Sequence, residues 1–494
     1  MGSALLRALG LGSLFILFAQ FAYGDDVELR RYYRCYERLT GKPVPYADRS
    51  NPMLTSIKTA ASGSTAAKDA CAALLNGAAL ASTNLSGDPR VIKKLHEVAR
   101  GFIATPEYFN AIQKQAIPHL IDTYEIANAF TYFTLKPGAD FSTILTGNQT
   151  FTAMRTLTSA PIYQLLSPFT AFSAHGPGNT TLTTVSYIQQ GDLLGIVPAV
   201  PNATLYPDSS GKLDRDLPAS TVGTSNTATR DMNAPTGAGL FGTQSYLISA
   251  DVNQGMLQNG TTLLRRRLMR NIYQDFFCKS LPVVLSSDYP DITPISSATY
   301  PDASAYRFSS TCLQCHVSMD RGAAIFRNLI SVKSGGPDDL GSIQFVANRS
   351  AGSFAPDQGG TDLSFPKVPD PLFYTRAPKG KLFFRSYDSN RTLIDLDING
   401  IGALGTAIAA QDDFYACVAS KYYKYFTGIS VNLENLEVRA QANPTAASLN
   451  PDQIYHRNQV IALGQNLKTS KSLKSLILEI INSQAFIRPD WGAP

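Results

Sequence analysis

The chain has 494 residues, of which 16% are charged and 44% hydrophobic, with 43 Lys and Arg against 38 Asp and Glu. This composition excludes a disordered chain, a collagen and a small disulfide-stapled fold, and the length is sufficient for a sizeable hydrophobic core. The formal charge is only +5 and the basic residues are dispersed, whereas nucleic-acid binding needs a dense basic stripe, so we expect no nucleic-acid partner.

The first 24 residues have the organisation of a secretory signal peptide. An early Arg7 precedes an apolar run over residues 11–22, and the small residues Ala22 and Gly24 flank Tyr23 just before two aspartates. The alternative is an amphipathic or transmembrane anchor, but the run is shorter than the roughly 20 residues that cross a bilayer. No other stretch is apolar for long enough. We therefore expect cleavage after Gly24 and a periplasmic, secreted or cell-surface protein without a membrane span.

The rest of the chain divides into four segments that differ in composition and in predicted secondary structure. Residues 25–174 predict a helical domain, in which apolar residues recur every three or four positions between Ile92 and Ile103. Residues 175–235 are rich in Thr, Asn and Pro and predict a long irregular excursion. Residues 236–400 contain a helix near 263–279 and are irregular from 334 to 400. Residues 401–494 predict a C-terminal helical domain.

The last helix shows one apolar stripe, after Thr469 and Ser470 as candidate caps. Its members are Leu473, Leu476, Ile477, Ile480 and Ile481. The predicted fold class is therefore mainly α, with c-type cytochrome-like helical domains, long irregular insertions and minor β structure.

One motif carries chemistry: Cys312, Leu313, Gln314, Cys315 and His316 form a CxxCH in a chain that is predicted to be exported. This combination indicates covalent attachment of one haem c, with Cys312 and Cys315 as the thioether sites and His316 as the proximal iron ligand. A thioredoxin-type disulfide and half of a zinc site are the alternatives. The first would follow a strand, and polar loop precedes this motif. The second would need two more ligands at close spacing.

The other four cysteines are expected to form disulfides, because the export route leads to an oxidising compartment. Four thiols allow three pairings, and the sequence alone does not choose among them. Cys35 with Cys71 closes the shortest N-terminal loop, which leaves Cys278 to pair with Cys417. Buried, unpaired thiols are the alternative.

The position of the methionines limits the sixth iron ligand. No methionine follows Met319, and Met319 is so close to His316 that it must share the proximal side. Met232 is favoured as the distal ligand because it lies in a Pro- and Gly-containing loop, whereas Met269 is expected to pack and His456 to face solvent. An iron without a protein sixth ligand is the other alternative. The remaining candidates are Met53, Met154, Met256, His96, His119 and His175.

Four arginines cluster in the helix predicted near residues 263–279, namely Arg265, Arg266, Arg267 and Arg270. Guanidinium groups bind carboxylates in a bidentate manner, so the cluster is a candidate for pairing with the haem propionates. The alternative, which we favour slightly, is a solvated helix face or a site for an acidic partner.

Several motifs around the CxxCH resemble those of planctomycete-type cytochrome-like proteins, which are exported, helical, multidomain bacterial proteins of unknown function. They are the stretch 239–243, the Arg-rich helix ending at Cys278, the CxxCH followed by Met319 and Asp320, the group Phe414, Cys417, Tyr422 and Gly428, and the terminal stretch 483–486. Some relatives carry Asp-Met-Pro before the first stretch, which supports Met232 as a ligand. The resemblance implies a helical, monohaem c-type cytochrome-like fold and supplies no established substrate.

The function favoured by the sequence is electron transfer with a redox partner protein or with a small-molecule electron donor or acceptor. A haem-dependent peroxidase or another redox enzyme is one alternative. A surface or structural binding protein, with haem as a folding cofactor, is another. Whether the chain is an enzyme is left open, and no catalytic residue is predicted.

Overall fold

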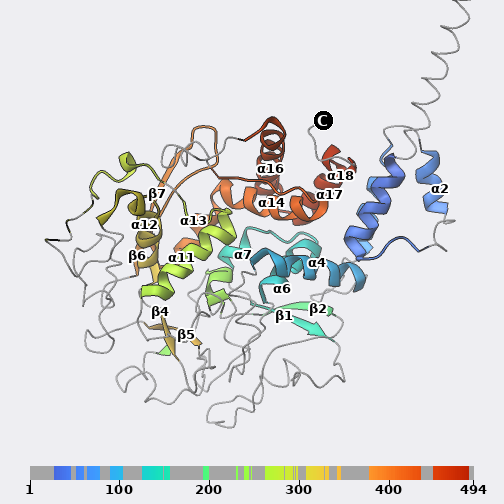
Figure 1. The fold of residues 1–494 in the computed structure, drawn as a ribbon. Helices are drawn as coiled ribbons and strands as arrows, with labels where there is room; N and C mark the ends of the chain where they lie inside the picture. Colours follow the sequence, from blue (N-terminus) through green and yellow to red (C-terminus); the bar gives the residue numbers. More distant parts are fainter. Residues whose placement is uncertain are drawn as a thin grey trace, which may run out of the picture.

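The computed structural model describes most of the helical parts of the chain (Figure 1). The described residues are 27–45, 52–60, 64–77, 89–103, 125–147, 150–155, 193–199, 230–231, 238–243, 246–247, 262–282, 284–292, 294, 296, 298, 308–326, 329–332, 342–346, 378–434 and 449–488. The predicted signal peptide, residues 1–24, lies outside them.

The described residues are mainly helical, as the sequence predicted. After a first helix over residues 27–40 come α2 (Pro52–Thr59), α3 (Ala66–Gly77), α4 (Pro89–Ile103), α6 (Glu125–Leu135), α7 (Thr143–Thr146), the 3-10 helix η3 (Gly239–Gly242), α11 (Thr262–Phe277), the 3-10 helix η4 (Ser286–Asp288), α12 (Ser310–Ala323) and the 3-10 helix η6 (Ala324–Phe326). The C-terminal helices are α13 (Gly400–Ala409), α14 (Asp412–Thr427), α16 (Pro451–Ser470), α17 (Leu473–Asn482) and α18 (Gln484–Ile487).

In the part of the chain that the structure describes, three small antiparallel sheets accompany the helices. Strand β1 (Thr150–Arg155) pairs with β2 (Leu193–Ala199), and β5 (Ser342–Val346) lies between β3 (Arg230–Asp231) and β4 (Leu329–Val332). Strand β6 (Lys379–Arg385) forms a hairpin with β7 (Leu393–Asn399). The predicted excursion 175–235 therefore contains β2 and β3.

Helices from both ends of the chain share one large hydrophobic cluster. It includes Cys35 of the first helix, Phe130 of α6, Phe276 of α11 and Phe486 of α18. Phe141 stacks on Phe414 of α14, with ring centroids 5.6 Å apart. The predicted N-terminal and C-terminal helical segments thus contribute to the same core, and Figure 1 shows α14 and α17 beside α4 and α6.

The apolar stripe predicted for the last helix is confirmed, because all five of its residues are buried in α17. The predicted caps are wrong. Thr469 and Ser470 belong to the end of α16, and Ser472 caps α17 by accepting a hydrogen bond from the backbone N–H of Ser475 at 3.2 Å. Helix α16 ends only at Ser470, because the residue that breaks its helical backbone is Lys471, which has a left-handed conformation with φ of 52°.

Residues 334–400 are not irregular throughout, because β6 and β7 occupy 379–399. Strand β6 is buried on both faces. Phe383 packs into a small cluster with Leu313 and Val317 of α12, whereas Leu382 and Phe384 enter the main core. A strand with two buried faces lacks the alternation of apolar and polar residues that marks a half-exposed strand, and for this reason the sequence did not reveal it.

Candidate functional site

The CxxCH motif occupies the first turns of α12. Cys312 is exposed, Cys315 is partly buried, and the His316 side chain is 28% exposed. Positions three and four apart lie on one face of a helix, so these three side chains share a face. Leu313 and Val317, on the opposite face, are buried in the small cluster with Phe383. The packing of α12 therefore turns both thiols and the imidazole away from the core.

Cys312 and Cys315 are not joined to each other or to another described cysteine by a disulfide. The thioredoxin-type alternative has no counterpart in this geometry. Within the ranges that the structure describes, no group of three or more His, Cys, Asp or Glu side chains is arranged to hold a metal ion. A haem needs no such cluster, since the porphyrin supplies four of the iron ligands and the protein one or two.

Behind the imidazole lies a buried ion pair between α11 and α12. The side chain of Asp320 has no exposed surface, and Arg266 contacts it with Nε 2.7 Å from Oδ1 and Nη2 3.0 Å from Oδ2. Asp320 follows His316 by four residues, and its Oδ2 lies 3.6 Å from the His316 Nδ1. The pairing of Arg266 with Asp320 was not predicted from the sequence, and the proximity of Asp320 to His316 was not predicted either. The four-residue spacing between His316 and Asp320 was the available signal.

A buried hydroxyl borders the motif. Tyr289 follows η4 and packs against Leu313 and Val317, and its hydroxyl has no hydrogen-bond partner among the described residues. Burial, followed by the negative charges of Asp288 and of the Cys315 thiolate, raises the pKa of Tyr289. Arg385 of β6 pairs with Asp288 and so holds this loop in place. Two cysteines, an adjacent imidazole and a buried hydroxyl without a partner among the described residues are chemically compatible with the edge of a covalently held haem.

The arginines of α11 do not form a solvated face. Arg265 is completely buried and donates from Nε to the backbone oxygen of Phe326 at 2.9 Å, while Arg266 is engaged with Asp320. The solvated-face interpretation is therefore wrong for these two residues, because protein acceptors on and just beyond α12 satisfy their guanidinium groups. Arg267 and Arg270 are half-buried. Pairing of Arg267 and Arg270 with haem propionates stays a prediction.

Three candidates for the sixth ligand lie in the described residues, and all three are in the core. Met269 packs between α11 and α12, where a side chain on Gly322 would overlap its sulfur, so its expected packing role is confirmed. His456 does not face solvent as predicted. It is buried, and its Nδ1 lies 2.8 Å from the hydroxyl of Tyr423. His96 Nε2 lies 2.9 Å from Asn128 Oδ1.

The favoured ligand, Met232, follows β3 and lies outside the described residues, as do His119, His175, Met256 and the side chains of Met53 and Met154. Its role stays a prediction.

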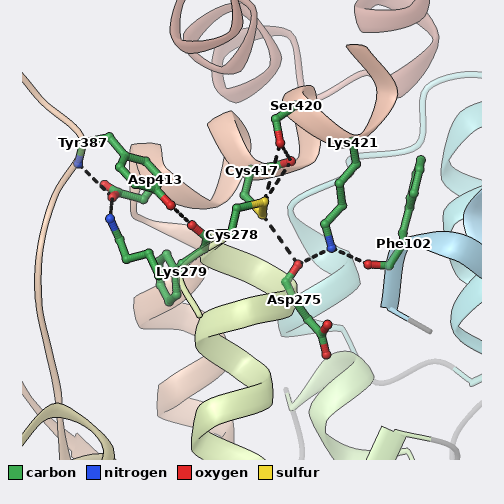
Figure 2. The surroundings of a disulfide bond; sticks show 10 residues. Phe102, Asp275, Cys278, Lys279, Tyr387, Asp413, Cys417, Ser420 and Lys421 are labelled. Carbon is green, nitrogen blue, oxygen red and sulfur yellow. Dashed lines mark hydrogen bonds and ion pairs between the residues drawn. A yellow bond between two sulfur atoms is a disulfide. The ribbon is translucent and has the colours of Figure 1, made fainter. Parts of the chain in front are cut away.

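The four remaining cysteines lie at disulfide distance in the two pairs that the sequence singled out. The Cα atoms of Cys35 and Cys71 are 6.2 Å apart, and those of Cys278 and Cys417 are 5.3 Å apart. Figure 2 shows that the second pair joins the end of α11 to the middle of α14. Cys278 has a φ of 52° and ends α11, a left-handed position at which glycine is the usual residue.

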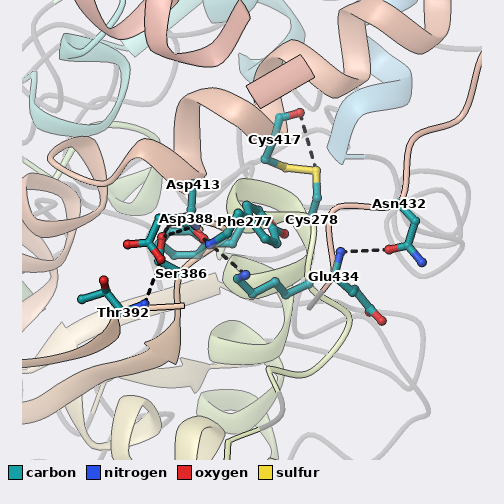
Figure 3. Close-up of polar contacts among 11 residues, drawn as sticks. Phe277, Cys278, Ser386, Asp388, Thr392, Asp413, Cys417, Asn432 and Glu434 are labelled. Carbon is teal, nitrogen blue, oxygen red and sulfur yellow. Dashed lines mark hydrogen bonds and ion pairs between the residues drawn. A yellow bond between two sulfur atoms is a disulfide. The ribbon is translucent and has the colours of Figure 1, made fainter. Parts of the chain in front are cut away.

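Two lysines flank the Cys278–Cys417 pair, of which Lys279 is buried and Lys421 is half-buried. Lys421 donates to the backbone oxygens of Phe102 and Asp275, the latter at 2.6 Å (Figure 2). Lys279 lies 3.2 Å from Asp413 Oδ1. Burial lowers the pKa of each lysine to about 8. A short network extends from this point, in which Asp413 accepts hydrogen bonds from Ser386 Oγ at 2.6 Å and from the Tyr387 N–H at 2.9 Å (Figure 3 shows its surroundings).

No protein-family model matches this chain, no curated protein matches it, and no solved structure matches it. The resemblance to planctomycete-type cytochrome-like proteins therefore stays a prediction that rests on the motifs quoted above. None of the helices in the described part of the chain is both long and apolar enough to cross a membrane.

Proposed function

We propose that this protein is an exported monohaem c-type cytochrome that transfers electrons to or from a partner, either a redox protein or a small molecule. The observation that carries the proposal is the placement of Cys312, Cys315 and His316 on one outward face of α12. Cys312 and Cys315 would hold the haem c covalently, and His316 would bind its iron. When bound, the haem supplies a one-electron couple.

The exposure of this face supports electron transfer in particular. Cys312 is exposed and His316 is partly exposed, so a group attached here meets solvent and a docking partner along one edge. Leu313 and Val317 anchor the other face and keep the attachment residues on a rigid helix.

Expression with haem-maturation machinery tests the proposal. We expect a pyridine haemochrome spectrum and haem that stays with the polypeptide on a denaturing gel. The double variant Cys312→Ala, Cys315→Ala should lose both signals. Its matched control, Cys35→Ala with Cys71→Ala, removes two cysteines elsewhere and should retain them. A wild-type protein without covalent haem would overturn the proposal.

The spectrum of the loaded protein then separates the two redox alternatives. A low-spin ferric spectrum agrees with electron transfer, and Met232→Ala should abolish a methionine–iron charge-transfer band. An unchanged band in that variant would exclude Met232 as the ligand. A high-spin ferric spectrum would instead favour peroxide reduction or another reaction at an open iron position.

A further inference from the structure

The imidazole of His316 faces the carboxylate of Asp320, which a buried ion pair holds in place. Asp320 lies one helical turn further along α12, with its Oδ2 3.6 Å from His316 Nδ1. The two contacts from Arg266 hold both carboxylate oxygens, and the Asp320 side chain has no exposed surface. The His316 side chain as a whole is 28% exposed, whereas its Nδ1, the atom that faces Asp320, is buried. Rotation about the bond that joins its ring to Cβ is soft, and a small turn brings Nδ1 within hydrogen-bond distance of Oδ2.

This arrangement distinguishes the two ring nitrogens. A carboxylate beside Nδ1 favours the tautomer with the proton on Nδ1, because that N–H then donates to the carboxylate. The lone pair of Nε2 is left for a metal. Carboxylates and carbonyls that bind the second nitrogen of a metal-bound histidine fix the ring orientation and make the imidazole a stronger electron donor.

We propose that Asp320, held in place by Arg266, is the positioning residue of His316: it presents Nε2 to the haem iron and strengthens the electron donation of the imidazole. This proposal rests on the proposed function, since it requires that His316 binds iron. It also connects two features that the sequence shows only separately, the Arg-rich helix α11 and the Met319-Asp320 pair after the CxxCH.

The electrostatic consequence follows from the position of Asp320. A stronger donor on the iron and a nearby carboxylate both stabilise the more positive ferric state over the ferrous state. Arg266 pairs with both oxygens of the carboxylate and so offsets the free-energy cost of burying its charge. Because the charge of Asp320 alone already shifts the redox equilibrium, a second measurement that follows the electron donation of the imidazole separates a positioning role from a purely structural ion pair between α11 and α12.

The test compares three proteins that carry haem: the wild type, Asp320→Asn and Asp413→Asn. Asp413 is a matched control because it is also a buried aspartate with a basic partner, Lys279. Pyridine haemochrome measures covalent attachment, and spectroelectrochemistry against a fixed reference couple measures the redox equilibrium. We expect Asp320→Asn to retain covalent haem and to shift this equilibrium toward the ferrous state by about tenfold. The control should leave it unchanged.

A vibrational measurement gives an independent readout. In the ferrous carbon monoxide adduct, a strong donor opposite the gas weakens the iron–carbon bond, so Asp320→Asn should raise the iron–carbon stretching frequency. If Asp320→Asn does not fold, Asp320→Glu keeps the charge but displaces the carboxylate, and it should shift the same frequency. Covalent haem with an unchanged equilibrium and an unchanged frequency in the variant that folds overturns this proposal and leaves the proposed function intact. Absence of covalent haem in the wild type overturns both.

Discussion

The Cys278–Cys417 pair is expected to contribute more to stability than any other crosslink in the described residues. It closes 139 residues of sequence, whereas Cys35–Cys71 closes 36. In the chain-entropy description, a crosslink stabilises the folded state by restricting the unfolded chain, and the effect grows with the logarithm of the loop length. It amounts to about 5 kcal/mol for the long loop and about 4 kcal/mol for the short one.

The perturbation is the double variant Cys278→Ser, Cys417→Ser, and its matched control is Cys35→Ser, Cys71→Ser. The assay is guanidinium chloride unfolding followed by far-UV circular dichroism. We expect the free energy of unfolding to fall by the amounts given above, with the larger loss for the long loop. The single variant Cys278→Ser should lose nearly as much as the double variant, because removing either sulfur breaks the bond.

Two results would refute this reasoning. The first is a loss below about 1 kcal/mol in the long-loop variant, since that is far less than the entropy of a loop of this size. The second is additivity, in which Cys278→Ser and Cys417→Ser each contribute separately to the double variant. Additive losses would mean that the two thiols pack independently and are not bonded.

Three further predictions follow from buried groups. Burial lowers the Lys421 pKa from 10.5 to about 8, so the charge on this lysine opposes folding below pH 8, and this effect fades as the pH rises. Unfolding titrations should show the free energy of unfolding of the wild type rising by about 2 kcal/mol between pH 8 and 10 relative to Lys421→Met. Equal pH slopes in the two proteins would contradict the lowered pKa. A Cβ on Gly464 would lie 2.6 Å from the Cα of Ala416, whereas a Cβ on Gly101 would meet open space. Thermal melts should therefore show that Gly464→Ala lowers the free energy of unfolding by more than about 2 kcal/mol and that Gly101→Ala raises it by about 0.5 kcal/mol. A Gly464→Ala variant that is as stable as the wild type would show that the α14–α16 crossing is looser than described. Arg266→Leu leaves Asp320 buried without this ion partner, so a urea titration should show the free energy of unfolding lower by about 3–5 kcal/mol. Arg266→Lys should recover part of this loss. A loss near zero would mean that water reaches the carboxylate.

The parts of the fold that the sequence predicted are those with local signals. The stripe of α17 and the spacing in α4 follow from helical periodicity, which needs only a few neighbouring residues. Counting left three cysteine pairings open, and the two pairs in the structure are those in which Cys35 and Cys71 close the short N-terminal loop. The CxxCH motif is also read from residues that are adjacent in the sequence, and haem attachment to it stays a prediction.

The parts that were missed depend on distant contacts. His456 lies in a polar stretch of α16, yet it is buried because Tyr423 of α14 provides a partner for its ring nitrogen. The pairing of Arg266 with Asp320 joins residues 54 positions apart, and no local pattern specifies it. Charged residues in a helix usually indicate a solvated face. Arg265 and Arg266 are exceptions because their hydrogen-bond acceptors lie in η6 and α12, which are distant in the sequence.

The division of α12 between two hydrophobic clusters has a consequence for the order in which the protein matures. Its first turns, which carry the CxxCH, are held by the small cluster around Phe383, whereas η6 at its far end places Ile325 and Phe326 in the main core. Unwinding of residues 310–318 uncovers only that small cluster, and the cost of a local opening scales with the apolar surface that it exposes. The proposed attachment residues can therefore become accessible to an enzyme while the rest of the described core stays folded.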